Sequence, residues 1–177
     1  MNRRDFHRLG TVVLGWLVKL AVAVPAAAFL LNPLRKQAGA SDAAAFEGLV
    51  PLSQLEVGVP QAFGIVRDQV DAWVKYPQEP VGSVWLVRQP DGVEPRVLAY
   101  SAECPHLGCA INLAVDGKSF LCPCHTSSFD LEGKPQNHVP PRPMDRLEVE
   151  LSDDADPEVR VLFQRFRTLA EEKIPLA

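Results

Sequence analysis

Two short stretches, CPHLGC at residues 104–109 and CPCH at residues 122–125, decide how this chain of 177 residues is interpreted. They contain all four cysteines and two of the four histidines of the chain, and twelve residues separate them. Thiolates together with imidazoles suit zinc or iron–sulfur chemistry, so the pattern predicts a metal centre built from two loops. Each loop supplies one thiolate and one imidazole: Cys104 with His106, and Cys122 with His125.

A structural zinc site is one interpretation, because two Cys and two His form a common tetrahedral set of zinc ligands. Two features of the sequence count against it. The C-x-H spacing is unusual for a zinc-binding loop, and each stretch has a further cysteine, Cys109 or Cys124, that a four-ligand zinc site would leave unused. From ligand types and spacing alone, both zinc and iron–sulfur chemistry stay open.

The residues around the two stretches have the pattern of short β-strands. From residue 46 onward the apolar runs are short and rich in β-branched residues, and turn-forming residues such as Asp116-Gly117 separate them. Residues 69–76 fit either an irregular strand or a helical turn. This spacing predicts an antiparallel sandwich or barrel over residues 46–177. We expect strands at 62–66, 81–88, 96–101, 146–151 and 159–163.

The N-terminal part has a different composition, which predicts a membrane anchor. Residues 9–31 are apolar with Lys19 as their only charge, and 23 helical residues would span about 34 Å, enough for a hydrocarbon core of about 30 Å. Residues 1–8 place an Arg-Arg pair before this run, which resembles a twin-arginine export signal. A secretory signal cleaved after Ala40 is the alternative, but the apolar core of such signals is typically only about 7–15 residues long.

A linker is expected between anchor and head, and the two parts differ in charge. Residues 32–45 are mostly small and polar and show no apolar periodicity, so we predict a flexible hinge there. Residues 1–45 have 6 Lys and Arg against 2 Asp and Glu, whereas residues 46–177 have 12 against 20. An acidic head argues against nucleic-acid binding, which needs a basic surface.

The paired loops closely resemble those of the Rieske iron–sulfur protein family, in the form found in quinol-oxidising cytochrome bc and bf complexes. The resemblance implies an all-β head, an antiparallel Rieske-type sandwich with cluster-binding loops at 104–109 and 122–130, on a single N-terminal transmembrane helix. It also implies a proline-rich loop at 138–143 covering the cluster. The implied cofactor is a 2Fe-2S cluster, with Cys104 and Cys122 on one iron and His106 and His125 on the other. The spare cysteines, Cys109 and Cys124, would then form a disulfide that clamps the loops together.

Two residues near the second histidine bear on the redox potential of the implied cluster, and a third bears on the geometry of the loop. Ser127 stands where the family often has a serine whose hydroxyl donates to a cluster sulfur, so we expect Ser127 to contribute to cofactor binding. Phe129 stands where high-potential members usually have tyrosine, and a phenyl ring cannot donate. Because Phe129 removes one donor, we expect a lowered potential, which favours menaquinol as the substrate. Thr126 replaces the more usual glycine, so we expect a slightly different backbone geometry there.

The function implied by the resemblance is electron transfer in a membrane quinol:cytochrome c oxidoreductase, as a subunit that is not active alone. It would take one electron and a proton from quinol, with His125 and His106 facing the quinol. The implied partners are a cytochrome b subunit, a c-type cytochrome and the lipid bilayer of a bacterial inner membrane, with the head on the periplasmic side. Two alternatives are the Rieske subunit of a periplasmic arsenite oxidase and a zinc-stabilised binding module tethered to a membrane.

Overall fold

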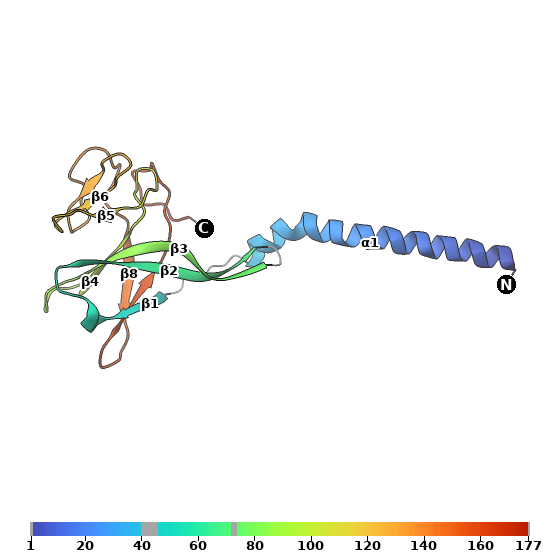
Figure 1. Ribbon diagram of the computed structural model, residues 1–177, viewed down its shortest axis with the longest axis horizontal. Helices are drawn as coiled ribbons and strands as arrows, with labels where there is room; N and C mark the ends of the chain where they lie inside the picture. The colour runs from blue at the N-terminus through green and yellow to red at the C-terminus, as the bar shows by residue number, and fades with distance from the viewer. Residues whose placement is uncertain (1, 40–45, 72–73, 177) are drawn as a thin grey trace. The chain divides into compact units, whose positions relative to one another are not determined.

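A computed structural model describes residues 2–39, 46–71 and 74–176 of the chain. The chain divides into two compact units, Met1–Ala43 and Ala44–Ala177, and each is considered by itself (Figure 1). The first unit contains one helix and the second contains the strands. In chain order the elements are α1 (Arg3–Gly39), β1 (Phe46–Pro51), the 3-10 helix η1 (Leu52–Gln54), β2 (Pro60–Asp71), β3 (Val74–Arg88), β4 (Val97–Ser101), β5 (Asn112–Leu113), β6 (Phe120–Leu121), β7 (Ser128–Phe129), β8 (Arg146–Leu151) and β9 (Glu158–Leu162).

Helix α1 contains the predicted anchor and extends beyond it. Within its segment Arg3–Leu31, an 18-residue window has a mean hydropathy of 2.1, and the segment is long and apolar enough to cross a membrane. The helix continues to Gly39, so the prediction of a linker over 32–45 is wrong for residues 32–39. The missing apolar periodicity in that stretch argues against a buried face, but residues such as Leu, Arg, Lys, Gln and Ala still favour helix. The remaining linker residues, 40–45, lie outside the described part of the chain.

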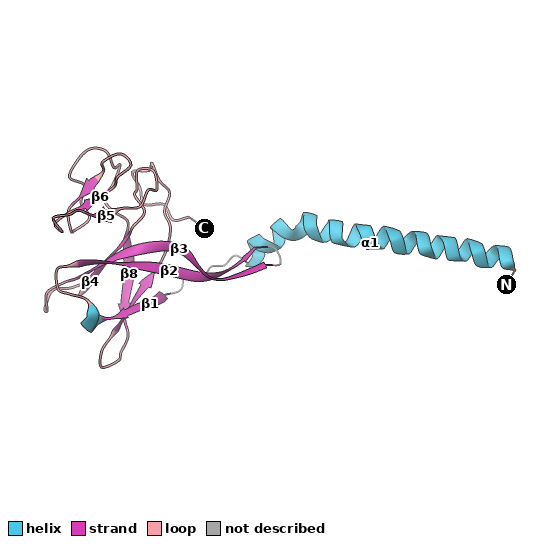
Figure 2. Ribbon diagram, in the orientation of Figure 1, coloured by secondary structure: helices cyan, strands magenta, loops and turns pink. Residues whose placement is uncertain are grey.

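The head is built on a six-stranded antiparallel sheet with the strand order β1-β9-β8-β4-β3-β2. Figure 2 shows the strands of the head as magenta arrows. The predicted all-β antiparallel fold is confirmed, and each of the five predicted strands overlaps an observed one. Of residues 69–76, whose structure the sequence left open, 69–71 belong to β2 and 74–76 to β3, two strands that pair antiparallel. Gln69 of β2 pairs with Tyr76 of β3, and Asp71 pairs with Val74.

The main core lies on this sheet and follows from alternation along the strands. Val84 and Leu86 of β3 are fully buried, as are Val159 and Val161 of β9. On β9 the residues beside these two valines are more exposed. Successive side chains of a strand point to opposite faces, so residues two apart reach the same core. Ala99 of β4 completes the centre of the packing.

A second, smaller sheet has the order β5-β6-β7, and each of its strands is two residues long. Its core is centred on Phe120, which packs on Trp85 of β3 at 5.3 Å between ring centroids. The indole N–H of Trp85 donates to the carbonyl of Ile111 at 3.0 Å and joins the small sheet to the large one. Two cysteines, Cys104 and Cys122, are members of this second core.

Candidate metal centre

The first cysteine-containing loop follows β4 and folds into a tight turn. The N–H of Gly108 donates to the carbonyl of Cys104 at 2.8 Å, and the N–H of Cys104 donates to the carbonyl of Cys109 at 2.8 Å. Gly108 has a φ of 78°, a left-handed conformation that glycine adopts without steric cost. The turn brings both cysteines of CPHLGC close together and leaves His106 at its tip, half-buried.

The second loop connects β6 to β7 and is closed by a similar bond. The N–H of Cys122 donates to the carbonyl of Ser127 at 2.8 Å. Thr126 has a φ of 59°, so the position where glycine is more usual does adopt the left-handed conformation. Asn137 lies just before the proline-rich loop, and its side-chain amide donates to the carbonyl of Thr126 at 2.7 Å. The second loop is therefore held from both sides.

A disulfide joins the two loops. Cys109 and Cys124 form an S–S bond of 2.07 Å, with their Cα atoms 6.5 Å apart. This is the pairing that the resemblance implies, and the prediction of a disulfide is confirmed. The two remaining cysteines are free thiols. A covalent clamp of this kind restricts the loops to a narrow range of separations.

The four predicted ligands form an inner pair and an outer pair. Cys104 and Cys122 are 0% and 2% exposed, inside the second core. His106 and His125 lie nearer the surface, with ring centroids 4.9 Å apart and ring planes at 89°. His125 is the more exposed of the two imidazoles. Thiols therefore face the protein interior, while imidazoles face outward.

This arrangement does not suit a single tetrahedral ion. A metal ion held by four ligands would draw all four donor atoms close to one point. In the part of the chain that the structure describes, the donor atoms that gather within 4.8 Å of one another are those of Cys109, Cys122 and Cys124, and two of these cysteines form the disulfide. Separate thiol and imidazole pairs fit the two irons of a 2Fe-2S cluster better than one zinc ion.

The polar atoms around Cys104 also fit a bound cluster. Burial raises the pKa of the Cys104 thiol, while a hydrogen bond from the backbone of His106 and the neighbouring Ser127 hydroxyl lower it. Ser127 is 0% exposed, and its hydroxyl oxygen makes no well-aligned hydrogen bond to any described residue. A buried hydroxyl without a partner is costly, and a cluster sulfur would accept its hydrogen bond. Thiols, imidazoles and hydroxyl together match the donor set that a 2Fe-2S cluster needs.

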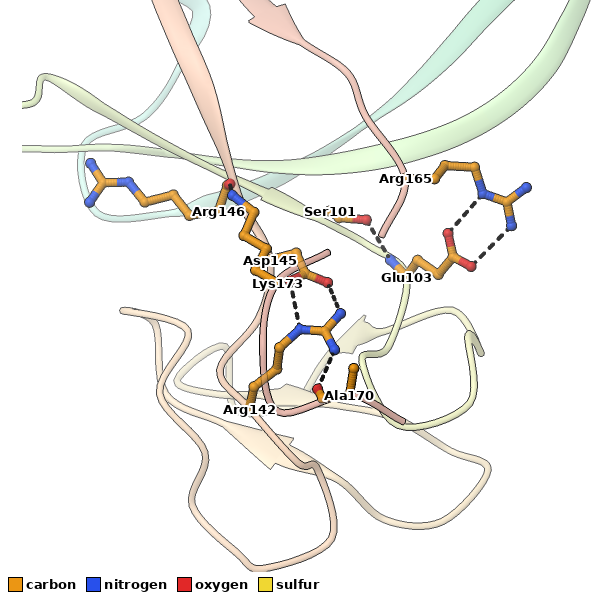
Figure 3. Close-up of polar contacts among 8 residues, drawn as sticks. All are labelled: Ser101, Glu103, Arg142, Asp145, Arg146, Arg165, Ala170 and Lys173. Atoms are coloured by element: carbon orange, nitrogen blue, oxygen red, sulfur yellow. Dashed lines mark hydrogen bonds and ion pairs between the residues drawn. The ribbon is translucent and has the colours of Figure 1, made fainter. Parts of the chain in front are cut away.

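The sequence did not predict the ion pair that supports the proline-rich loop. Arg142 is 6% exposed and donates through two nitrogens to Asp145, at 2.9 and 2.7 Å (Figure 3). A third nitrogen of Arg142 donates to the carbonyl of Ala170 at 2.6 Å. The i,i+3 spacing of Arg142 and Asp145 was the only sequence signal for the pair. No local pattern indicates the contact with Ala170, which is 28 residues away.

Comparisons with known proteins identify the family of the chain. The Rieske [2Fe-2S] domain family matches residues 58–150. The menaquinol:cytochrome c reductase iron-sulfur subunit of Bacillus subtilis (strain 168) is 31% identical over 157 residues, which cover 86% of this chain and 88% of that subunit. A solved structure, the plasma membrane Rieske protein from Synechocystis PCC 6803, is 28% identical, covers 47% of this chain and 79% of its own, and has a TM-score of 0.36. The chain therefore belongs to the Rieske [2Fe-2S] family, and its cofactor is a 2Fe-2S cluster.

Proposed function

We propose that this chain is the electron-transfer subunit of a membrane quinol:cytochrome c reductase. The observation that supports the proposal best is the position of the two imidazoles, half-buried His106 and exposed His125, outside two buried thiols. A substrate can reach the imidazole side without entering the core. The relative from Bacillus subtilis, named a menaquinol:cytochrome c reductase iron-sulfur subunit, matches over most of both chains.

The four proposed ligands would hold the cluster, and one of them, His125, would also take the proton from the quinol. Cys104 and Cys122 would bind one iron from the interior, and His106 and His125 would bind the other. When bound, such a cluster accepts one electron at a potential well above that of all-cysteine clusters, because neutral imidazoles replace two thiolates. The ring nitrogen of His125 that does not bind iron accepts the hydrogen bond of a quinol hydroxyl and takes its proton.

Helix α1 and the disulfide bear on where the protein is located, and the proposed function implies its partners. Helix α1 would anchor the head to a bacterial inner membrane by a single span, with the head on the periplasmic side, where a disulfide such as Cys109–Cys124 persists. A cytochrome b subunit would provide the quinol site, and a c-type cytochrome would accept the electron. Menaquinol is the proposed quinol, since Phe129 lacks the donor that would raise the potential.

The proposal is tested on the complex extracted from membranes through a tag on this chain. We expect a b-type cytochrome to copurify, and a menaquinol analogue to reduce the cluster, observed as its rhombic paramagnetic resonance signal. Arsenite in place of quinol is the matched control, because reduction by arsenite instead would identify an arsenite oxidase subunit. A head that contains stoichiometric zinc and no iron, after growth with iron supplied, would reject both redox functions.

A further inference from the structure

The segment after β9, residues 163–176, forms a compact strap that lies outside the family match at 58–150. Its two halves pair with each other: the N–H of Arg167 donates to the carbonyl of Ile174, and the N–H of Leu176 donates to the carbonyl of Arg165, both at 2.8 Å. Phe166 is 6% exposed and fixes the strap to the main core. The strap is therefore an ordered part of the head.

Buried charge ties the strap to the proline-rich loop. The side chains of Arg142 and Asp145 are each 5% exposed, and Arg142 uses its third donor on the carbonyl of Ala170. Figure 3 shows this guanidinium between Asp145 and Ala170. Each nitrogen of this buried guanidinium has an acceptor, and losing one would be costly, so the bond to Ala170 holds the strap against the proline-rich loop.

The strap also contacts the first cluster loop, at two points. Arg165 makes two hydrogen bonds of 3.0 Å to the carboxylate of Glu103, the residue before Cys104 (Figure 3). The N–H of Leu169 donates to the carbonyl of Pro105 at 3.0 Å. Leu169 has a φ of 55°, which is rare for a residue with a side chain, and its side chain is 64% exposed. The strained backbone thus presents a donor to the loop, whereas the side chain buries little surface.

The peptide that receives this hydrogen bond is one that also reaches Cys104. The carbonyl of Pro105 and the N–H of His106 belong to the same planar trans peptide, so they point in opposite directions. His106 follows Cys104 by two residues in the tight turn that the hydrogen bond from Gly108 to the carbonyl of Cys104 closes, and the backbone of His106 is hydrogen-bonded to the Cys104 thiol. Fixing the carbonyl therefore fixes the direction of the N–H, and a hydrogen bond at one end of a peptide strengthens donation at the other.

We propose that the C-terminal strap positions the Pro105–His106 peptide through the N–H of Leu169, so that the His106 N–H donates to the Cys104 sulfur and raises the reduction potential of the cluster. Reduction adds negative charge to the cluster and its sulfur ligands, and a donor aimed at a sulfur stabilises the reduced form preferentially. Leu169 is a positioning residue, since it acts through the peptide. The inference rests on the proposed role of Cys104 as an iron ligand.

The test removes the N–H of Leu169 and keeps its side chain. Replacing Leu169 with its α-hydroxy acid by nonsense suppression converts the amide to an ester and keeps the side chain. The same replacement at Leu176 is the matched control, because it removes a hydrogen bond of the strap, to the carbonyl of Arg165, that does not involve the cluster loop. Both chains are titrated with the cluster bound, and the readouts are the midpoint potential and the g-values of the reduced cluster.

We expect the equilibrium constant for reduction to fall about threefold in the Leu169 ester, or roughly 28 mV for one electron, with shifted g-values. The Leu176 ester should match the parent. Equal potentials in the two esters would overturn the proposal. As a second variant, a chain that ends at Thr168 removes the same donor with the rest of the strap, and an unchanged potential there would overturn it equally. If instead Cys104→Ala keeps its cluster in the full-length chain, the proposed ligand set is wrong.

Discussion

The two cores of the head are held together in different ways. The main core lies on strands of five to fifteen residues and contains fully buried aliphatic side chains such as Val84, Leu86 and Val161. The second core lies against strands of only two residues and includes the thiols of Cys104 and Cys122. Backbone pairing and apolar burial are extensive enough to stabilise the main core. The short strands of the second core provide too little of either to stabilise it alone.

The second core instead depends on cross-links between loops. The disulfide joins the two cysteine-containing loops, Asn137 links the second loop to the residues before the proline-rich loop, and Arg142 links that loop to the strap. The buried thiols of Cys104 and Cys122 are the proposed iron ligands, and the buried hydroxyl of Ser127 is the proposed donor to a cluster sulfur. We therefore expect cluster binding to complete the fold of this region and the main core to form without it.

The largest expected effect comes from removing a ligand. Cys104→Ala should abolish the rhombic signal of the reduced cluster and loosen the second core, while the large sheet stays folded. The measurements are paramagnetic resonance and hydrogen exchange, in which the amides of β5, β6 and β7 should lose protection and those of β3 and β9 should keep it.

Leu86→Ala is the matched variant in the main core. It deletes a fully buried side chain, so we expect a loss of about 2–5 kcal/mol in the free energy of unfolding, spread over the whole head, with the cluster signal retained below the unfolding transition. If Cys104→Ala unfolds the large sheet as well, the two cores are one cooperative unit and the contrast between them fails.

The disulfide should have the next largest effect. Replacing both Cys109 and Cys124 with Ala removes a cross-link across a sequence separation of 15, for which the entropy of loop closure predicts a loss of about 3 kcal/mol. Because this cross-link joins loops of the second core, the half-life of the bound cluster should shorten much more than the melting temperature of the main sheet falls. Cluster release is followed by visible absorbance, and the single variant Cys109→Ala controls for a free thiol. An unchanged half-life would mean that other contacts hold the loops.

Thr126→Gly tests strain in the second loop. Thr126 is β-branched and has a φ of 59°, a conformation that costs such a residue roughly 1–3 kcal/mol. Glycine removes that strain but loses about 0.5–1 kcal/mol through the entropy of the unfolded chain. We expect a net stabilisation of about 1 kcal/mol by chemical denaturation. The control is Thr126→Ala, which loses the hydroxyl but keeps a side chain at positive φ. Equal stabilities for the Gly and Ala variants would show that backbone strain is not stored at this position.

The sequence predicted the strands of the main sheet but not those of the second sheet. Short apolar runs rich in β-branched residues, such as those that contain Val84 and Val161, identified strands of the main sheet. The strands of the second sheet are too short for any period, and strand β1 was not among those predicted. The cysteine pairs were recognisable because they are close in sequence. The contact between Leu169 and Pro105 joins residues 64 positions apart through backbone atoms alone, so no side-chain pattern could indicate it.

The smallest expected effect is a change of potential from adding one hydroxyl. Phe129 of β7 is 0% exposed and belongs to the same buried cluster of side chains as Cys104 and Cys122. Phe129→Tyr adds a phenol hydroxyl among these buried side chains. The family resemblance implies that a cysteine sulfur accepts its hydrogen bond. A hydrogen bond to a charged group is worth about 1.5–3 kcal/mol, or roughly 65–130 mV for one electron if it exists only in the reduced state.

The measured shift should be smaller, because the phenol also donates to the sulfur when the cluster is oxidised. We expect Phe129→Tyr to raise the midpoint potential by about 30 mV, equivalent to roughly 0.7 kcal/mol for one electron. Parent and variant are titrated side by side, and a structure of the variant must show the phenol within hydrogen-bonding distance of the sulfur. No shift with the phenol so placed would refute the electrostatic explanation. If the potential rises but the rate of menaquinol oxidation is unchanged, the electrostatic explanation is supported. Phe129 would then no longer be a reason to propose menaquinol as the substrate.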